Sequence, residues 1–244
     1  MQKDSGPVFE TIPGLLVEAT SRYSKPNALS FPRDGRWVSM SHAELRCQVE
    51  ALALGLLEEG VGRGDAVGLI APSSPLWVVV DLAVQCIGAV SVPLFKRISA
   101  ESFAHEVRDS GMRWLFVGNP EEMPMAFEHA RGSATLVTFW YSGRHEHFEQ
   151  ILARGRERAR RQPGLFESLC ARVAPSDLAT IIYTSGSTGL PKGVELTQAN
   201  IISQVHASTE IFPPSPDADV CLSVLPPEHI FERMSLYFYI SSGA

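Results

Sequence analysis

Three short apolar runs between residues 66 and 117 alternate with two segments that carry helix signals. The runs are residues 66–71, 89–95 and 113–117, and each has the length of a strand. Ser74 and Pro75 provide an N-cap and a first-turn proline for a helix that ends near Gly88. Residues 99–110 form the second helix, closed by Gly111. Continuously apolar strands alternating with helices predict an α/β fold, with parallel sheets covered by helices.

Flanking segments extend this pattern. Residues 41–59 predict a helix, because Ser41 and Glu44 match a capping box and apolar residues follow at helical spacing. The remaining assignments are strands at 135–139 and 177–183 and a connector at 162–175.

Composition excludes several classes of protein. The net charge of −6 gives the chain no general attraction for nucleic acid or anionic lipid. Asp81, Gln85 and Pro93 interrupt the most apolar stretch, residues 76–95, which favours a buried helix and strand over a membrane span. Residues 1–6 are polar and precede no apolar core of a signal peptide, so we expect a cytoplasmic protein.

Two further patterns have ordinary structural interpretations. The cysteines form no C-x-x-C pair and are expected to be reduced and mostly buried. Residues 145–161 are rich in arginine, but glutamates dilute the charge, so a solvated helix is favoured over a membrane or RNA patch. His145 and His147 have no further ligands spaced nearby, and no metal site is predicted from this chain.

One loop carries the chemistry. Residues 183–194 read Tyr-Thr-Ser-Gly-Ser-Thr-Gly-Leu-Pro-Lys-Gly-Val. Glycines permit a tight path that turns backbone amides toward an anion, hydroxyls add donors, and a lysine adds a mobile positive charge. This combination predicts a site for nucleotide phosphates. The candidate ligands are Thr184, Ser185, Gly186, Ser187, Thr188, Gly189 and Lys192.

The sequence pattern excludes three other well-known loop motifs and a flexible linker. A Walker A loop has glycine before its lysine, where this chain has Pro191. The glycine spacing does not match G-x-G-x-x-G, and a serine-hydrolase elbow centred on Ser187 would need glycine in place of Ser185. A flexible Ser/Gly linker requires neither the Pro-Lys-Gly ending nor a strand on each side.

The twelve-residue loop resembles the signature of the adenylate-forming (AMP-binding) superfamily. Residues 225–233, Leu-Pro-Pro-Glu-His-Ile-Phe-Glu-Arg, are similar to a block of the long-chain fatty acyl-CoA synthetase branch, and residues 64–94 resemble the early sheet of that family. The chain departs from the family pattern at two places. Gln198 stands where relatives often have histidine, and Pro227 and Glu228 replace a more apolar pair of residues.

The resemblance implies a two-step reaction. A fatty carboxylate attacks the α-phosphate of ATP to give acyl-adenylate and pyrophosphate, and coenzyme A then displaces AMP to give acyl-CoA. The loop would hold the β- and γ-phosphates, Mg²⁺ would bridge phosphate oxygens, and His229 would orient the carboxylate as the catalytic-site histidine. Glu232 and Arg233 are interpreted as an ion pair on a helix surface, without a catalytic role.

The resemblance also predicts an incomplete site. Residues 1–244 would form part of the N-terminal AMP-binding domain of the acyl-CoA synthetase-like fold, without the C-terminal domain. Residues 1–162 would be a first α/β subdomain, and residues 176–244 the phosphate-loop strand and the start of a second. We therefore expect the chain alone to lack full ligase activity.

Three alternatives remain open at this stage. A separate chain would complete a split ligase, a non-catalytic remnant would bind a nucleotide or partner or neither, and a related enzyme would adenylate another carboxylic acid. Fatty acid substrates partition into lipid, so peripheral membrane contact is compatible with the sequence. The sequence leaves the preferred chain length open.

Overall fold

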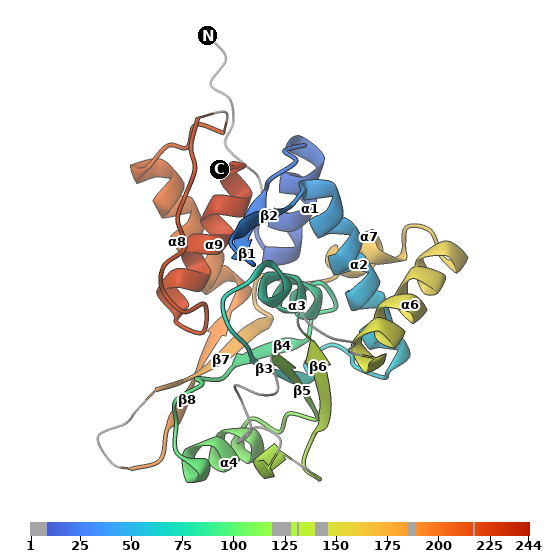
Figure 1. Ribbon diagram of the computed structural model, residues 1–244, viewed down its shortest axis with the longest axis vertical. Coiled ribbons are helices and arrows are strands. Elements are labelled where there is room, and N and C mark those ends of the chain that lie inside the picture. The colour runs from blue at the N-terminus through green and yellow to red at the C-terminus, as the bar shows by residue number, and fades with distance from the viewer. Residues whose placement is uncertain (1–8, 119–127, 131, 140–145, 185–188, 217) are drawn as a thin grey trace.

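The computed structural model describes residues 9–118, 128–130, 132–139, 146–184, 189–216 and 218–244. Within these residues, one sheet has the strand order β6–β5–β3–β4–β7–β8 (Figure 1). The strands are β3 Ala66–Ile70, β4 Val90–Pro93, β5 Trp114–Gly118, β6 Thr135–Phe139, β7 Leu178–Thr184 and β8 Lys192–Thr197.

The sheet is parallel except at one edge. Strands β3 to β7 pair in parallel, whereas β8 runs antiparallel to β7 because a short loop joins the two. The predicted α/β fold is confirmed, with one antiparallel edge strand. Strands β3 to β6 precede residues 162–176 in the chain and strands β7 and β8 follow them, yet all six belong to one sheet. The proposed subdomain boundary there stays a prediction.

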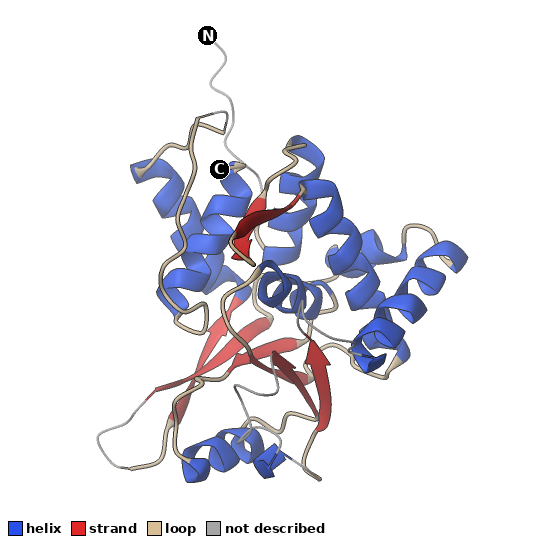
Figure 2. Ribbon diagram, in the orientation of Figure 1, coloured by secondary structure: helices blue, strands red, loops and turns tan. Residues whose placement is uncertain are grey.

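Helices cover both faces of the sheet (Figures 1 and 2). Helix α4 and the short helical segment at 128–130 lie on one face, and the other helices named below lie on the opposite face. The step from β3 to β4 and the step from β4 to β5 run in opposite directions across the sheet, so right-handed crossovers put their helices on opposite faces. The helices are α1 Ile12–Arg22, α2 His42–Glu58, α3 Pro75–Cys86, α4 Ala100–Asp109, α6 Glu146–Arg161, α7 Leu165–Cys170, α8 Gln198–Ile211 and α9 Ile230–Ser242.

Local signals fixed where three helices begin. The Ser41 side chain accepts from the amide of Glu44, and the Glu44 carboxylate accepts from the Ser41 amide, so the capping box is present. Ser74 caps α3 through the amide of Trp77, and Ser99 caps α4. These helix starts agree with the sequence prediction because each depends on residues within one turn.

Two expectations need correction, and two features were missed. The connector at 162–175 contains α7, because Phe166 and Cys170 lie one turn apart and both pack into the core. Of the cysteines, Cys86 and Cys170 are buried free thiols, but Cys47 and Cys221 are exposed free thiols. The hairpin of β1 Leu29–Arg33 and β2 Arg36–Met40, and helix α1, were not predicted.

The arginine-rich segment is a helix, as predicted, and one side of it is anchored. Buried Phe148, Ile151 and Leu152 pack into the core, so α6 is amphipathic rather than wholly solvated. Its arginines meet the acidic end of α2: Arg158 Nη1 lies 2.7 Å from Glu58 Oε1, and Arg154 pairs with Glu59. His145 lies outside the described residues, and no described helix is long and apolar enough to cross a membrane.

Gly155 allows α6 to cross α2 closely, since a Cβ there would lie 1.7 Å from the carbonyl oxygen of Ala51. Gly155→Ala should lower the free energy of unfolding by about 2 kcal/mol or more, despite a gain of about 1 kcal/mol in helix propensity. Urea denaturation measures the change. Gly62→Ala is the control, because its Cβ would meet only Asp65 Oδ2, at 3.9 Å. Equal midpoints for Gly155→Ala and the wild type would contradict the close crossing.

Candidate functional site

The predicted phosphate loop joins two paired strands. Strand β7 ends at Thr184, β8 begins at Lys192, and these two residues are partners in the antiparallel register. Both are exposed, so a hydroxyl and an ammonium group stand at the mouth of the loop. Ser185, Gly186, Ser187 and Thr188 lie outside the described residues, and their assignment as phosphate ligands stays a prediction.

Helix α4 holds both stems of this loop. The buried Tyr183 side chain donates a hydrogen bond from its hydroxyl to Asp109 Oδ2, 2.7 Å away. On the other stem, His105 Nε2 lies 2.9 Å from the carbonyl oxygen of Pro191, the residue before Lys192. Burial, with the bond to Asp109, raises the pKa of Tyr183, so its hydroxyl stays protonated and remains a donor. The stems are therefore fixed before any ligand binds.

The backbone geometry explains why two positions of the motif are occupied by glycine. Gly189 has φ +117°, a conformation that side chains rarely adopt. Gly193 pairs with Tyr183, and a Cβ there would lie 2.8 Å from Ile181 Cγ2. The absence of a side chain at Gly193 allows β7 and β8 to approach closely, and their pairing places Lys192 opposite Thr184.

His229 lies at the same edge of the sheet as the loop. It is exposed at the N-cap of α9, and its ring meets the edge of Phe95 with centroids 4.8 Å apart. Phe95 follows β4, and β4 is parallel to β7, so the carboxyl ends of both strands face the same side. Ligands bind at this edge in open α/β sheets. The structure thus brings His229 to the edge from which the loop leaves, and its role stays a prediction.

The expected surface pair of Glu232 and Arg233 is wrong. The Arg233 side chain is fully buried, and Nη2 and Nε lie 2.5 and 3.1 Å from the two carboxylate oxygens of Asp81 on α3. Glu232 instead accepts from Ser223. Burial alone would lower the pKa of Arg233, but Asp81 and Tyr237 together outweigh it and the pKa is raised. The sequence did not show that both side chains are buried.

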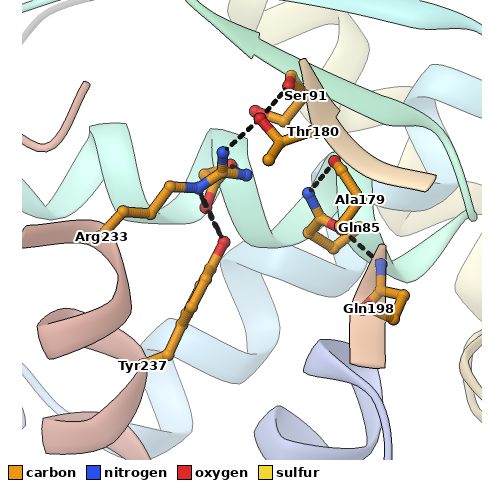
Figure 3. Close-up of polar contacts among 8 residues, drawn as sticks. Gln85, Ser91, Ala179, Thr180, Gln198, Arg233 and Tyr237 are labelled. Carbon is orange, nitrogen blue, oxygen red and sulfur yellow. Dashed lines mark hydrogen bonds and ion pairs between the residues drawn. The ribbon is translucent and has the colours of Figure 1, made fainter. Parts of the chain in front are cut away.

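A second buried polar cluster explains Gln198. Its Nε2 lies 2.6 Å from Gln85 Oε1, and its Oε1 accepts from the amide of Ile12 at 2.9 Å. Gln85 in turn donates to the carbonyl oxygen of Ala179 on β7, 2.9 Å away (Figure 3). The polar residues that interrupt the apolar stretch at Asp81 and Gln85 are therefore the two points where α3 holds distant segments.

Glu228, next to His229, is also buried. Only 5% of its surface is exposed, and Oε2 has no hydrogen-bond partner among the described residues. Burial raises the pKa of this carboxyl, although nearby Lys96 and His229 act in the opposite direction. A buried carboxyl next to His229 makes the surroundings of this histidine more polar than the apolar pair expected from the family resemblance would.

Glu106, in the middle of α4, should make stability depend on pH. It is 2% exposed, its Oε2 has no described partner, and burial raises its pKa from 4.5 to about 7. Because the folded pKa is the higher one, wild-type stability is retained below pH 4.5 and lost as the pH rises through about 7. Glu106→Gln should therefore stabilise the protein at pH 8 by at most about 3 kcal/mol and leave it unchanged at pH 4.

Urea denaturation at the two pH values measures this difference. Glu101→Gln, at an exposed position in the first turn of the same helix, should not stabilise the protein at either pH and should cost less than about 1 kcal/mol at pH 8. A Glu106→Gln variant that is no more stable than the wild type at pH 8 would show that the carboxyl is solvated or paired.

The chain belongs to the AMP-binding enzyme family, whose pattern matches residues 17–244. Long chain acyl-CoA synthetase 7, peroxisomal, of Arabidopsis thaliana is 30% identical over 97% of this chain and 35% of its own length. Long-chain-fatty-acid–CoA ligase FadD15 of Mycobacterium bovis is 32% identical over 74% of this chain and 30% of its own. Both relatives are acid–thiol ligases by name, and the chain spans about a third of their length.

A solved structure supports the fold. The anthranilate CoA ligase AuaEII in complex with anthranoyl-AMP superposes with a TM-score of 0.78 and 20% identity, over 100% of this chain and 46% of that one. At this identity the likeness shows the architecture only. The predicted acyl-CoA synthetase-like fold is confirmed.

Proposed function

We propose that this chain supplies the phosphate-side part of a long-chain fatty acid–CoA ligase. The observation that carries the proposal is the exposed pair of Thr184 and Lys192, held across the mouth of the loop by strand pairing. Membership of the AMP-binding family and similarity to enzymes named long-chain acyl-CoA synthetases support it.

In the proposed reaction these residues form no covalent bond with the substrates. A carboxylate oxygen of the fatty acid forms a bond to the α-phosphorus of ATP, the bond to the bridging oxygen breaks, and pyrophosphate leaves. The thiol of coenzyme A then loses its proton to solvent, its sulfur bonds to the acyl carbon, the bond from that carbon to the phosphate oxygen breaks, and AMP leaves. Lys192 and the Thr184 hydroxyl would stabilise charge on the departing pyrophosphate, while His229 would orient the carboxylate.

The metal belongs to the substrate in this proposal. Mg²⁺ prefers oxygen ligands, and among the described residues no cluster of three or more acidic, histidine or cysteine side chains is present. An ammonium group such as Lys192 does not bind a cation. In the proposed site Mg²⁺ would enter on the phosphate oxygens of ATP.

The test is nucleotide binding by the 244-residue chain, followed by pyrophosphate exchange with a panel of acids. We expect MgATP to bind, and we expect palmitate rather than an aromatic or amino acid to support any exchange, in line with the relatives named long-chain acyl-CoA synthetases and ligases. Failure to bind MgATP would overturn the proposal in favour of a non-catalytic remnant. Exchange with an aromatic or amino acid, but not with palmitate, would reassign the substrate.

A further inference from the structure

A buried network connects α9 to the strand that enters the loop. Arg233, fully buried, holds Asp81 with two nitrogens, and the Tyr237 hydroxyl donates to Asp81 Oδ2 at 2.5 Å. Figure 3 shows Arg233 and Tyr237 extending from α9 toward Thr180 on β7. These contacts join segments that are distant in sequence at a single point beneath the edge of the sheet.

Thr180 links this network to the strands. Arg233 Nη1 donates to Thr180 Oγ1 at 2.7 Å, and Thr180 donates in turn to the carbonyl oxygen of Ser91 at 2.6 Å. Ser91 and Thr180 are register partners of β4 and β7. The hydroxyl of Thr180 therefore ties α9 to both strands whose carboxyl ends carry the candidate site.

Both ends of this link lie one short step from the site. Arg233 comes one helical turn after His229, and its amide donates to the carbonyl oxygen of His229 at 3.1 Å. Thr180 stands four residues before Thr184 on the same strand. A shift of the Arg233 to Thr180 contact would consequently change the distance between His229 and the stem of the loop.

The chemistry of the network suits positioning better than stabilisation. A buried ion pair recovers little net stability over well-packed apolar side chains, because both charges must be desolvated. Its hydrogen bonds are directional, however, and every partner here accepts or donates along a defined line. Apolar packing between α9 and β7 would allow sliding that this set of bonds forbids.

We infer that Thr180 and Arg233 are positioning residues that fix the separation of His229 from the phosphate-loop stem. This inference rests on the proposed function for its consequence in catalysis. Thr180→Val removes the hydroxyl while keeping the Asp81–Arg233 pair, and Thr180→Ser restores the hydroxyl. Gln85→Met is the control, since it removes the buried hydrogen bonds of Gln85 to Ala179 on β7 and to Gln198 on α8 but none to α9.

The first measurement is the NMR spectrum of the full chain with labelled histidine. The Phe95 ring, 4.8 Å from that of His229, makes the His229 signals sensitive to small displacements. Thr180→Val should move these signals, whereas Thr180→Ser and Gln85→Met should leave them in place. Unmoved His229 signals in Thr180→Val, or equal movement in all three variants, would overturn the inference.

The second measurement is pyrophosphate exchange in any preparation that shows it. Thr180→Val should lower the carboxylate-dependent exchange rate about ten-fold or more and change KM for MgATP less than about three-fold, because misplacement of one reactant acts on the chemical step. An unchanged rate, or equal losses in Thr180→Val and Gln85→Met, would refute the positioning role. If no wild-type preparation shows exchange, the proposed function loses its support, and the NMR result alone decides the positioning.

Discussion

Replacing Asp81 by leucine should lower the free energy of unfolding by about 3–5 kcal/mol, because it leaves a guanidinium buried without its counter-charge. Arg233 is fully buried and cannot shed its proton to escape the penalty. Thr180 and Tyr237 contact the same guanidinium but carry no compensating charge. A loss of this size is a large part of the stability of an ordinary domain. Urea denaturation followed by circular dichroism measures it.

The double variant Asp81→Leu/Arg233→Met separates charge from packing. With both charges removed, we expect at least about 2 kcal/mol of the loss to return. The surface pair of Asp65 and Arg113, whose side chains are 33% and 68% exposed, provides the control. Arg113→Met should cost less than about 1 kcal/mol. A double variant as unstable as the sum of its singles would show that the pair contributes by shape rather than by charge neutralisation.

Replacing Lys192 by methionine should weaken MgATP binding about 10- to 100-fold and leave the fold intact. Charge-assisted hydrogen bonds contribute about 1.5–3 kcal/mol, and the exposed ammonium has no neighbouring carboxylate in the described ion pairs. Binding of the fatty acid should change far less, since the proposed contact is with phosphate. Equilibrium dialysis with labelled ATP measures the nucleotide, and a thermal melt checks the fold.

A general loss of positive charge must be distinguished from loss of this contact. Arg156→Met removes one charge from an exposed position on α6, which packs near the opposite edge of the sheet from β8. Its MgATP affinity should match that of the wild type. Equal weakening in both variants would indicate a long-range charge effect, and no weakening in Lys192→Met would remove this lysine from the site.

The features that were predictable from sequence are local ones. The caps at Ser41, Ser74 and Ser99 and the buried strands β3 to β5 follow from residues close together in the chain. The β1–β2 hairpin had such a signal in Asp34 and Gly35, both of which adopt positive φ at its two-residue turn. The Asp-Gly dipeptide was sufficient to predict it.

Other features depend on partners that a single sequence does not reveal. Arg233 was interpreted as a surface residue because its partner, Asp81, lies 152 positions away. Helix α7 is held by packing of Phe166 and Cys170 rather than by a strong cap, and its N-cap makes no side-chain hydrogen bond. For the candidate site, the loop motif was recognisable from its residue order. The hydrogen bonds of His105 and Asp109 to the two stems of the loop became visible only in the folded structure.

The separation of Asp81 from Arg233 has a consequence for synthesis on the ribosome. Strands β3, β4 and β5 and helix α3 emerge long before α9, so for that interval the Asp81 carboxylate has no cation to accompany it into the core. Burying the ionised carboxylate alone would be costly, so we expect the surroundings of Asp81 to stay open to water until α9 arrives. Arrival of α9 supplies the missing charge. We therefore expect completion of this core to wait for the last helix of the described chain rather than for closure of the first strands.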